Sequence, residues 1–302
     1  MTRRELMLTA AAAAVAGATR ATAQTTARRA RTYCLFSKHL PDLSWSDVGK
    51  EAKAAGFAGI DLTVRAGGHV LPERAVDDLP RALDAIRAHG LSVPMITTDL
   101  TSAASPVARP LLTTAARHGV TFFKTGYWRY SPARDVRAQV AAASQAIAGL
   151  AALAAECGIV MGVHNHAGYI GGALWEIAPA MDKLDPSFAG YYFDPRHAVA
   201  EGGGGTWKAA ANMVAPRLKM VALKDFAWEK TAKGWQPRDC PLGEGMVDWA
   251  WFAAALRDAK FSGPISLHLE YEIAGATAAE RTRNTLAAAV RDLGVAKRVL
   301  EA

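Results

Sequence analysis

Seven side chains that can bind metal ions or move protons follow four consecutive apolar runs in the second half of the chain. In chain order they are His164, His166, Asp194, His197, Lys224, His268 and Glu270. Imidazole nitrogen and carboxylate oxygen together suit a divalent metal ion such as Mn²⁺, Zn²⁺, Co²⁺, Fe²⁺ or Ni²⁺. Imidazole, carboxylate and amine groups are also the usual general acids and bases. The set therefore predicts one divalent metal with acid–base groups beside it.

The apolar runs are predicted strands, because short apolar segments recur about every thirty residues and alternate with longer amphipathic segments. The expected strands are Thr32–Phe36, Gly59–Val64, Ser92–Thr97, Thr121–Lys124, Ile159–His164, Gly190–Asp194, Met220–Lys224 and Pro264–Glu270. Eight alternating units favour the α/β class and a single-domain (β/α)8 TIM barrel. A doubly wound sheet is the alternative, although no G-x-G-x-x-G follows an early strand. Functional residues of such barrels lie at the carboxyl ends of the strands.

Helical periodicity and glycine stop signals support the intervening helices. Residues expected to share a helix face are Val76, Leu79, Leu83 and Ile86, and further on Val136, Val140, Ile147 and Leu150. Glycines in the C-cap position follow four of these segments, at Gly56, Gly90, Gly119 and Gly158. The run Gly202–Gly205 is interpreted as a mobile loop, because no Lys-Ser or Lys-Thr pair follows it as in a phosphate-binding loop.

The amino terminus has the three parts of a secretion signal. Adjacent Arg3 and Arg4 precede an Ala-rich apolar run, and Ala21-Thr22-Ala23 resembles a cleavage site. We interpret residues 1–23 as a twin-arginine signal peptide, 24–31 as a linker and 32–302 as the barrel. The mature protein is then expected in the periplasm, exported already folded. No other apolar run is expected to reach the roughly 18 residues of a membrane span.

Composition excludes several other classes. The net charge of +7 comes from scattered basic residues, which indicates a solvated surface and neither nucleic-acid nor membrane binding after signal cleavage. The three cysteines, Cys34, Cys157 and Cys240, lack metal-type spacing. The chain also lacks the G-x-S-x-G of many serine hydrolases. Homo-oligomerisation stays open.

The order of motifs resembles the xylose isomerase-like barrel superfamily of sugar phosphate isomerases and epimerases, over nearly all of the chain after Arg31. The resemblance rests on Gly59-Ile60-Asp61-Leu62-Thr63, His164-Asn165-His166, Asp194 with His197, Lys224-Asp225, Pro241-Leu242-Gly243-Glu244-Gly245 with Asp248-Trp249, and Glu270. The resemblance implies one divalent metal ion, with Mg²⁺ among the candidates. In the family the ion is held by Glu, Asp, His and Glu at the ends of strands 5 to 8.

Two of those ligand positions differ in this chain. Asp194 and Glu270 match, whereas His164 stands in place of the first Glu and Ala222 in place of the His. The expected metal ligands are therefore His164, Asp194 and Glu270. Possible replacements for the missing family ligands are His268, His166 and His197.

The resemblance implies a metal-dependent sugar isomerase or epimerase that abstracts a proton next to a carbonyl through a metal-stabilised enediolate. Glu270, His166 and Lys224 are the candidate bases, and His197 is a candidate acid. Because His164 breaks the expected pair of facing carboxylates, a one-sided lyase or dehydratase on 3-keto-glycosides or keto-inositols is a close alternative. A non-catalytic sugar-binding barrel is a third reading, and an endonuclease at abasic sites, which would need a basic face, is a weaker one.

The resemblance implies a small sugar or keto sugar as the partner. Polar and aromatic residues near the other strand ends are candidates for binding it. They are Lys38, Asp61, Lys124, Tyr127 and Trp228. Charged groups there would orient hydroxyls, and aromatic rings would stack on the sugar.

Overall fold

The structure is a computed structural model that describes residues 31–133 and 135–301. The predicted signal peptide and all of the predicted linker except Arg31 lie outside these described residues.

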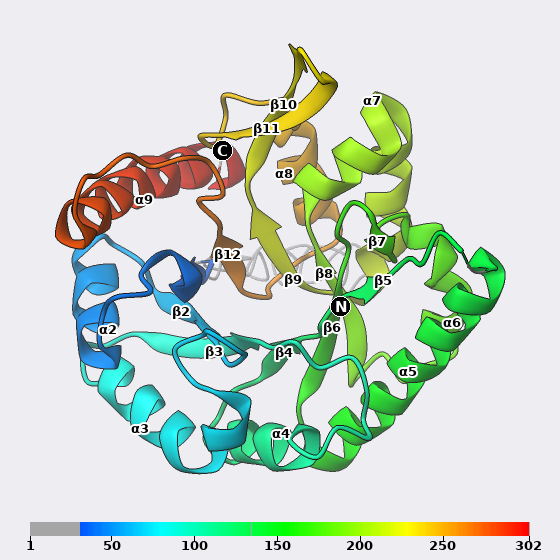
Figure 1. Ribbon diagram of the computed structural model, residues 1–302, viewed down its shortest axis with the longest axis horizontal. Coiled ribbons are helices and arrows are strands. Elements are labelled where there is room, and N and C mark those ends of the chain that lie inside the picture. The colour runs from blue at the N-terminus through cyan, green and yellow to red at the C-terminus, as the bar shows by residue number, and fades with distance from the viewer. Residues whose placement is uncertain (1–30, 134, 302) are drawn as a thin grey trace, which may run out of the picture. The chain divides into compact units, whose positions relative to one another are not determined.

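Within the described residues, eight parallel strands close into a barrel, which confirms the predicted fold (Figure 1). Their order around the barrel is β1-β12-β9-β8-β6-β4-β3-β2. The strands are β1 (Tyr33–Phe36), β2 (Gly59–Thr63), β3 (Ser92–Thr97), β4 (Phe122–Lys124), β6 (Val160–His164), β8 (Ala189–Phe193), β9 (Leu218–Leu223) and β12 (Ile265–Leu267). Every predicted strand is present, and each end agrees within three residues.

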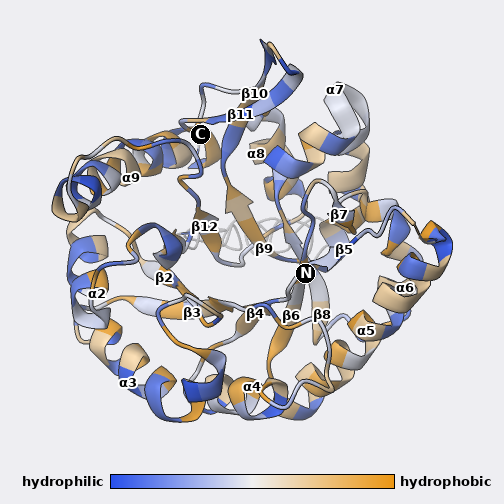
Figure 2. Ribbon diagram, in the orientation of Figure 1, coloured by the Kyte–Doolittle hydropathy of each residue, from blue (hydrophilic) through white to orange (hydrophobic). Residues whose placement is uncertain are grey.

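Helices form a ring around the strands, with apolar residues on the side that faces the barrel (Figures 1 and 2). They are α2 (Trp45–Ala54), α3 (Ala75–Arg87), α4 (Ala108–Arg117), α5 (Val136–Cys157), α6 (Ala178–Met181), α7 (Pro195–Val214), α8 (Trp249–Asp258) and α9 (Ala278–Glu301). Short 3-10 helices are η1 (Ser37–His39), η2 (Pro72–Arg74), η3 (Leu174–Glu176) and η4 (Ala215–Arg217).

The predicted helix faces are correct in their centres and wrong at their starts. Leu79, Leu83 and Ile86 are fully buried, but Val76 and Val136, each in the first turn of its helix, are more than half exposed. All four predicted stop glycines adopt positive φ, between 73° and 87°, where a side chain would be strained.

The inside of the barrel is filled by a small set of side chains at its centre. Met95, Tyr192, Met220 and Ala222 form this cluster, and each is fully buried. Gly162 makes room for it, because a Cβ there would lie 2.1 Å from Met220 Cε. Ala222 therefore belongs to the packed interior beneath the barrel mouth.

Several loops differ from the expectation. Two antiparallel hairpins were not predicted, β5 (Trp128–Arg129) with β7 (Tyr169–Ile170), and β10 (Asp225–Thr231) with β11 (Gly234–Cys240). The glycine run predicted as a loop lies inside α7, which kinks at Gly203. That residue has φ 57° and ψ −166°, outside the helical region.

Helix α5 contradicts the expectation that no apolar run after the signal is long enough to span a membrane. Its 22 residues have a mean hydropathy of 1.5 in the most apolar window, enough by length and composition to cross a membrane. In the fold one face of the helix is buried, with Ile147 and Leu150 fully inaccessible. Alanine-rich composition explains the high hydropathy of a helix that packs around a barrel.

Candidate active site

A pocket of about 260 Å³ opens at the carboxyl ends of the barrel strands. Its lining combines charged, imidazole and aromatic groups. The lining residues are Phe36, Lys38, Arg65, Thr97, Lys124, Tyr127, His164, His166, Tyr192, Arg196, His197, Lys224, Asp239, His268 and Glu270. The strand ends thus bring together most of the predicted site residues.

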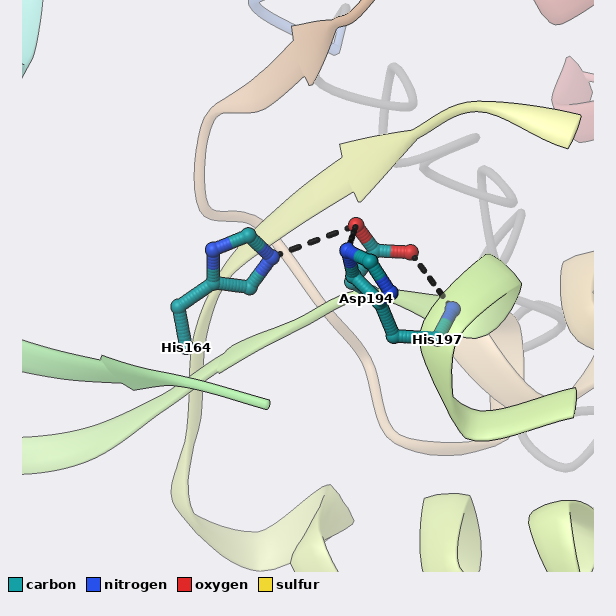
Figure 3. A group of neighbouring side chains, drawn as sticks. All are labelled: His164, Asp194 and His197. Atoms are coloured by element: carbon teal, nitrogen blue, oxygen red, sulfur yellow. Dashed lines mark hydrogen bonds and ion pairs between the residues drawn. The ribbon is translucent and has the colours of Figure 1, made fainter. Parts of the chain in front are cut away.

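Asp194 lies directly behind this pocket, at the junction of β8 and α7. Its Oδ1 accepts a hydrogen bond from the backbone N–H of His197 at 3.1 Å and so caps the helix (Figure 3). Asn165 holds the Asp194 backbone from both sides, donating to its carbonyl at 2.9 Å and accepting from its N–H at 2.8 Å. These contacts leave Asp194 Oδ2 free to face the pocket groups.

Two imidazoles converge on that oxygen. His164 Nε2 lies 3.2 Å and His197 Nε2 3.9 Å from Asp194 Oδ2 (Figure 3). One ligand atom from each of the three residues lies within 4.8 Å of the others. His197 Nε2 is buried and has no hydrogen-bond partner among the described residues. Two nitrogens and one oxygen, with one nitrogen unsatisfied, fit a divalent transition-metal ion.

A lysine shares the same carboxylate. Lys224 Nζ lies 3.1 Å from Asp194 Oδ2, and both side chains are buried. Burial alone would raise the pKa of Asp194, but Lys224 and the neighbouring imidazoles hold that pKa well below its usual range. Burial also lowers the pKa of His164 to about 3, so its imidazole is neutral at pH 7. A neutral imidazole is the form that binds metals.

Glu270 lies on another wall of the pocket, outside the three-residue group. Its Oε2 accepts a hydrogen bond from Lys38 Nζ at 2.6 Å, and its Oε1 lies 3.7 Å from His268 Nδ1. Burial opposes ionisation, but His268, Lys224 and Lys38 together lower the pKa of Glu270. The carboxylate is therefore ionised and 22% exposed. His268 turns its other nitrogen toward Tyr192, 3.0 Å away.

Aromatic contacts hold the imidazoles in place. Tyr127 Oη lies 2.9 Å from His164 Nδ1, so both nitrogens of His164 have partners. The ring of His166 lies 3.8 Å from that of His197, and its Nδ1 donates to the Ala167 carbonyl. Burial lowers the pKa of His166 to about 4.

Three charged pocket residues were missed by the sequence reasoning. They are Arg65, Arg196 and Asp239. Arg196 donates to Asp239 at 2.8 Å and to His197 Nδ1 at 3.2 Å. Its place in Asp194-Pro195-Arg196-His197, right after a strand, was a usable signal, whereas Asp239 reaches the pocket through the unpredicted β10–β11 hairpin.

Two predicted sugar-binding residues lie away from the pocket lining. Asp61 is fully buried within the barrel, where Thr97 and Ser266 each donate to it at 2.8 Å. Trp228 lies on the β10–β11 hairpin and is 39% exposed. Their predicted roles in binding substrate stay predictions.

The pattern of the xylose isomerase-like TIM barrel family matches residues 50–291 of the chain. No curated protein sequence matches this chain.

Solved structures share the fold at low sequence identity. D-psicose 3-epimerase from Clostridium cellulolyticum H10, solved with D-tagatose, is 12% identical with a TM-score of 0.68 over 90% of this chain and 100% of that one. The 3-keto-D-glucoside 4-epimerase from E. coli is 16% identical, with a TM-score of 0.61 over 86% and 99%. A xylose isomerase-like TIM barrel protein from Mycobacterium smegmatis, in complex with magnesium, is 18% identical, with a TM-score of 0.59 over 84% and 92%.

Proposed function

This chain belongs to the xylose isomerase-like TIM barrel family, and from that membership we propose that it is a metal-dependent sugar epimerase or isomerase. The observation that carries the proposal is the convergence of His164, Asp194 and His197 at the pocket that Glu270 also lines. A metal-binding group next to a general base is what proton transfer beside a carbonyl requires.

We propose His164, Asp194 and His197 as the residues that hold the metal. A divalent ion bound there supplies Lewis-acid polarisation of a carbonyl oxygen. This set keeps two of the predicted ligands, His164 and Asp194, and adds His197 in place of Glu270 and His268. The Lys224 ammonium beside Asp194 gives the site a further positive charge for a substrate oxygen.

The pocket suits a polar substrate of monosaccharide size. Lys38, Arg65 and Lys224 line it with positive charge, and the side chains of Tyr127 and Phe36 provide ring faces. Ammonium and guanidinium groups donate to sugar hydroxyl and carbonyl oxygens, and ring faces pack on the C–H surface of a sugar. A small sugar or keto sugar is therefore the proposed substrate.

Glu270 is the proposed base. It is ionised, lines the pocket and is outside the proposed metal group, and it can accept a proton from carbon once Lys38 releases its Oε2. Its partner Lys38 has a 42% exposed side chain and can move with little cost when substrate enters.

One observation favours the alternative of a keto-sugar lyase or dehydratase. His164 stands where the family resemblance places a second carboxylate, and both of its nitrogens are engaged, by Tyr127 and by Asp194. A lyase needs only one base on carbon and an acid for the departing oxygen, a role that His166 would fill. The reaction product distinguishes the two activities.

The test combines metal analysis with proton exchange. Purified protein is expected to hold close to one divalent ion per chain and to exchange a carbon-bound hydrogen of ketohexoses or 3-keto-glucosides with D₂O. His197→Ala should lower the metal content, and Glu270→Gln should abolish exchange of the hydrogen that Glu270 removes while retaining the metal. Bound metal without exchange on the whole panel would indicate a sugar-binding barrel. Absence of both would refute the proposal.

We also propose export to the periplasm through the twin-arginine pathway. The support is the sequence alone, Arg3-Arg4 before an apolar run. Fractionation of cells that produce the full chain should recover a shortened protein in the periplasm, and Arg3→Lys with Arg4→Lys should retain the full-length chain in the cytoplasm. Cytoplasmic recovery of the unaltered chain would refute export.

A further inference from the structure

Lys124 is the last residue of β4 and is almost completely inaccessible, with 1% of its surface exposed. It nevertheless lines the pocket. Its Nζ has no hydrogen-bond partner among the described residues and lies 3.5 Å from the centroid of the Tyr127 ring. Building on the proposed function, we propose that Lys124 is the second proton-transfer group, opposite Glu270, and that the reaction is a two-base epimerisation of a keto sugar.

The position of Lys124 in the barrel supports a role opposite Glu270. In the order β1-β12-β9-β8-β6-β4-β3-β2, strand β4 is four strands from β12 in either direction. Lys124 ends β4, and Glu270 follows three residues after the end of β12. The two side chains thus approach the pocket from opposite walls. Epimerisation needs this geometry, because a proton leaves one face of a carbon and another arrives on the opposite face.

The surroundings of Lys124 fit an amine that works in both protonation states. Burial lowers the pKa of Lys124 to about 7. The charged groups that act on it are Asp99 and Asp61, which favour the ammonium, and Arg65 and Lys224, which disfavour it. An amine with a pKa near the working pH can both accept and donate a proton.

Other pocket groups suit the second role less well. Lys224 is held by Asp194 at 3.1 Å and follows β9, which is next to β12, so it approaches from the side of Glu270. Both nitrogens of His164 are occupied. His197 is a proposed metal ligand, and His268 follows β12 as Glu270 does, so it approaches from the same side. His166 is the remaining rival, since only its Nδ1 is engaged, by a backbone carbonyl.

The step balances without any further reactant. In one direction, the Glu270 carboxylate takes the proton from the carbon beside the carbonyl, and the C–H electron pair becomes the C=C bond of an enediol form. The Lys124 ammonium then delivers its proton to the opposite face of that carbon. The enzyme ends with a protonated Glu270 and a neutral amine, which either catalyse the reverse direction or return to the starting state by exchange with water.

The test measures solvent exchange separately for each member of an epimer pair, such as D-fructose and D-psicose. The variants are Lys124→Met, Lys124→Gln and Glu270→Gln, and each is first shown to unfold cooperatively. Both lysine variants should lose epimerisation, and exchange from one epimer should fall by about 10²-fold or more while exchange from the other changes less than about threefold. Glu270→Gln should show the opposite pattern. A residue that only supports the fold would not separate the two epimers.

His166→Gln is the matched comparison and should lower both exchange reactions alike. The inference is overturned if the lysine variants lose both exchange reactions equally or neither, or if His166→Gln gives the one-sided pattern. If the unaltered protein exchanges hydrogen but the variants do not show the one-sided pattern, the role of Lys124 is refuted and the proposed function stands. No exchange with any sugar of the panel would refute both.

Discussion

Replacing Lys124 with methionine should change how the stability of the protein depends on pH. The unfolded chain binds a proton on this amine up to its ordinary pKa of 10.5, whereas the folded protein binds it only below about 7. Between these values unfolding takes up a proton, so this group makes the free energy of unfolding rise with pH by about 1.4 kcal/mol per unit. The loss of stability caused by burying this amine is complete below pH 7, and it disappears as the pH rises toward 10.5.

Methionine has nearly the same length and no charge, so Lys124→Met lacks this dependence. From pH 7.5 to 9.5 the stability of the unaltered protein should therefore gain about 2.7 kcal/mol on that of the variant. For a domain of this size the gain corresponds to about 5–10 °C in the difference between the two melting temperatures. Groups shared by both proteins cancel in that difference.

The assay is thermal unfolding of both proteins across this pH range, followed by circular dichroism. Lys233→Met is the control, because Lys233 is exposed on the β10–β11 hairpin and its variant should keep a constant difference from the unaltered protein. Parallel curves for Lys124→Met would refute the reasoning, since they would mean that the buried amine titrates as it does in the unfolded chain.

Three further substitutions test contacts that hold the site in place, one through metal affinity and two through the free energy of unfolding. Asn165→Ala removes both contacts to the Asp194 backbone and should weaken metal binding about 10- to 100-fold, measured by competition with a chelator; unchanged affinity would contradict a positioning role. Gly190→Ala places a Cβ 2.2 Å from the Arg217 carbonyl oxygen and should cost about 2 kcal/mol or more in a urea titration, whereas a neutral effect would mean that the backbone yields easily. Asp225→Ala leaves an indole and several backbone donors without their acceptor and should cost about 2–3 kcal/mol, with a shift below 0.5 kcal/mol as the contrary result.

The strands and the metal candidates could be predicted from sequence because both depend on local patterns. Apolar runs fix the strands, and parallel strands in a barrel bring their carboxyl ends together, which is why His164 and Asp194 meet as expected. His197 was predicted both as a candidate acid and as a replacement ligand, and the choice needs the structure, because the capping of α7 by Asp194 brings its ring toward the same oxygen.

The remaining differences come from contacts that sequence spacing does not encode. Asp61 was predicted to bind the sugar although it lies within an expected strand, and the structure buries it inside the barrel, where Thr97 and Ser266 donate to its carboxylate. Asp239 is far from any barrel strand and reaches the pocket only through the return strand of a hairpin. Lys124 was expected to bind substrate through its charge, and the absence of a partner for its amine among the described residues is visible only in three dimensions.

Asp194 joins two tasks in one side chain, since Oδ1 closes the first turn of α7 and Oδ2 faces the imidazoles and Lys224. Helical order at the start of α7 and ligand binding at Oδ2 are therefore thermodynamically linked. A ligand that binds Oδ2 also stabilises the helical turn formed by residues 195–199. Slower amide hydrogen exchange in this turn would serve as a gauge of ligand binding in the absence of any turnover. Substitutions at Asp194 accordingly act on the helix and on the chemistry together.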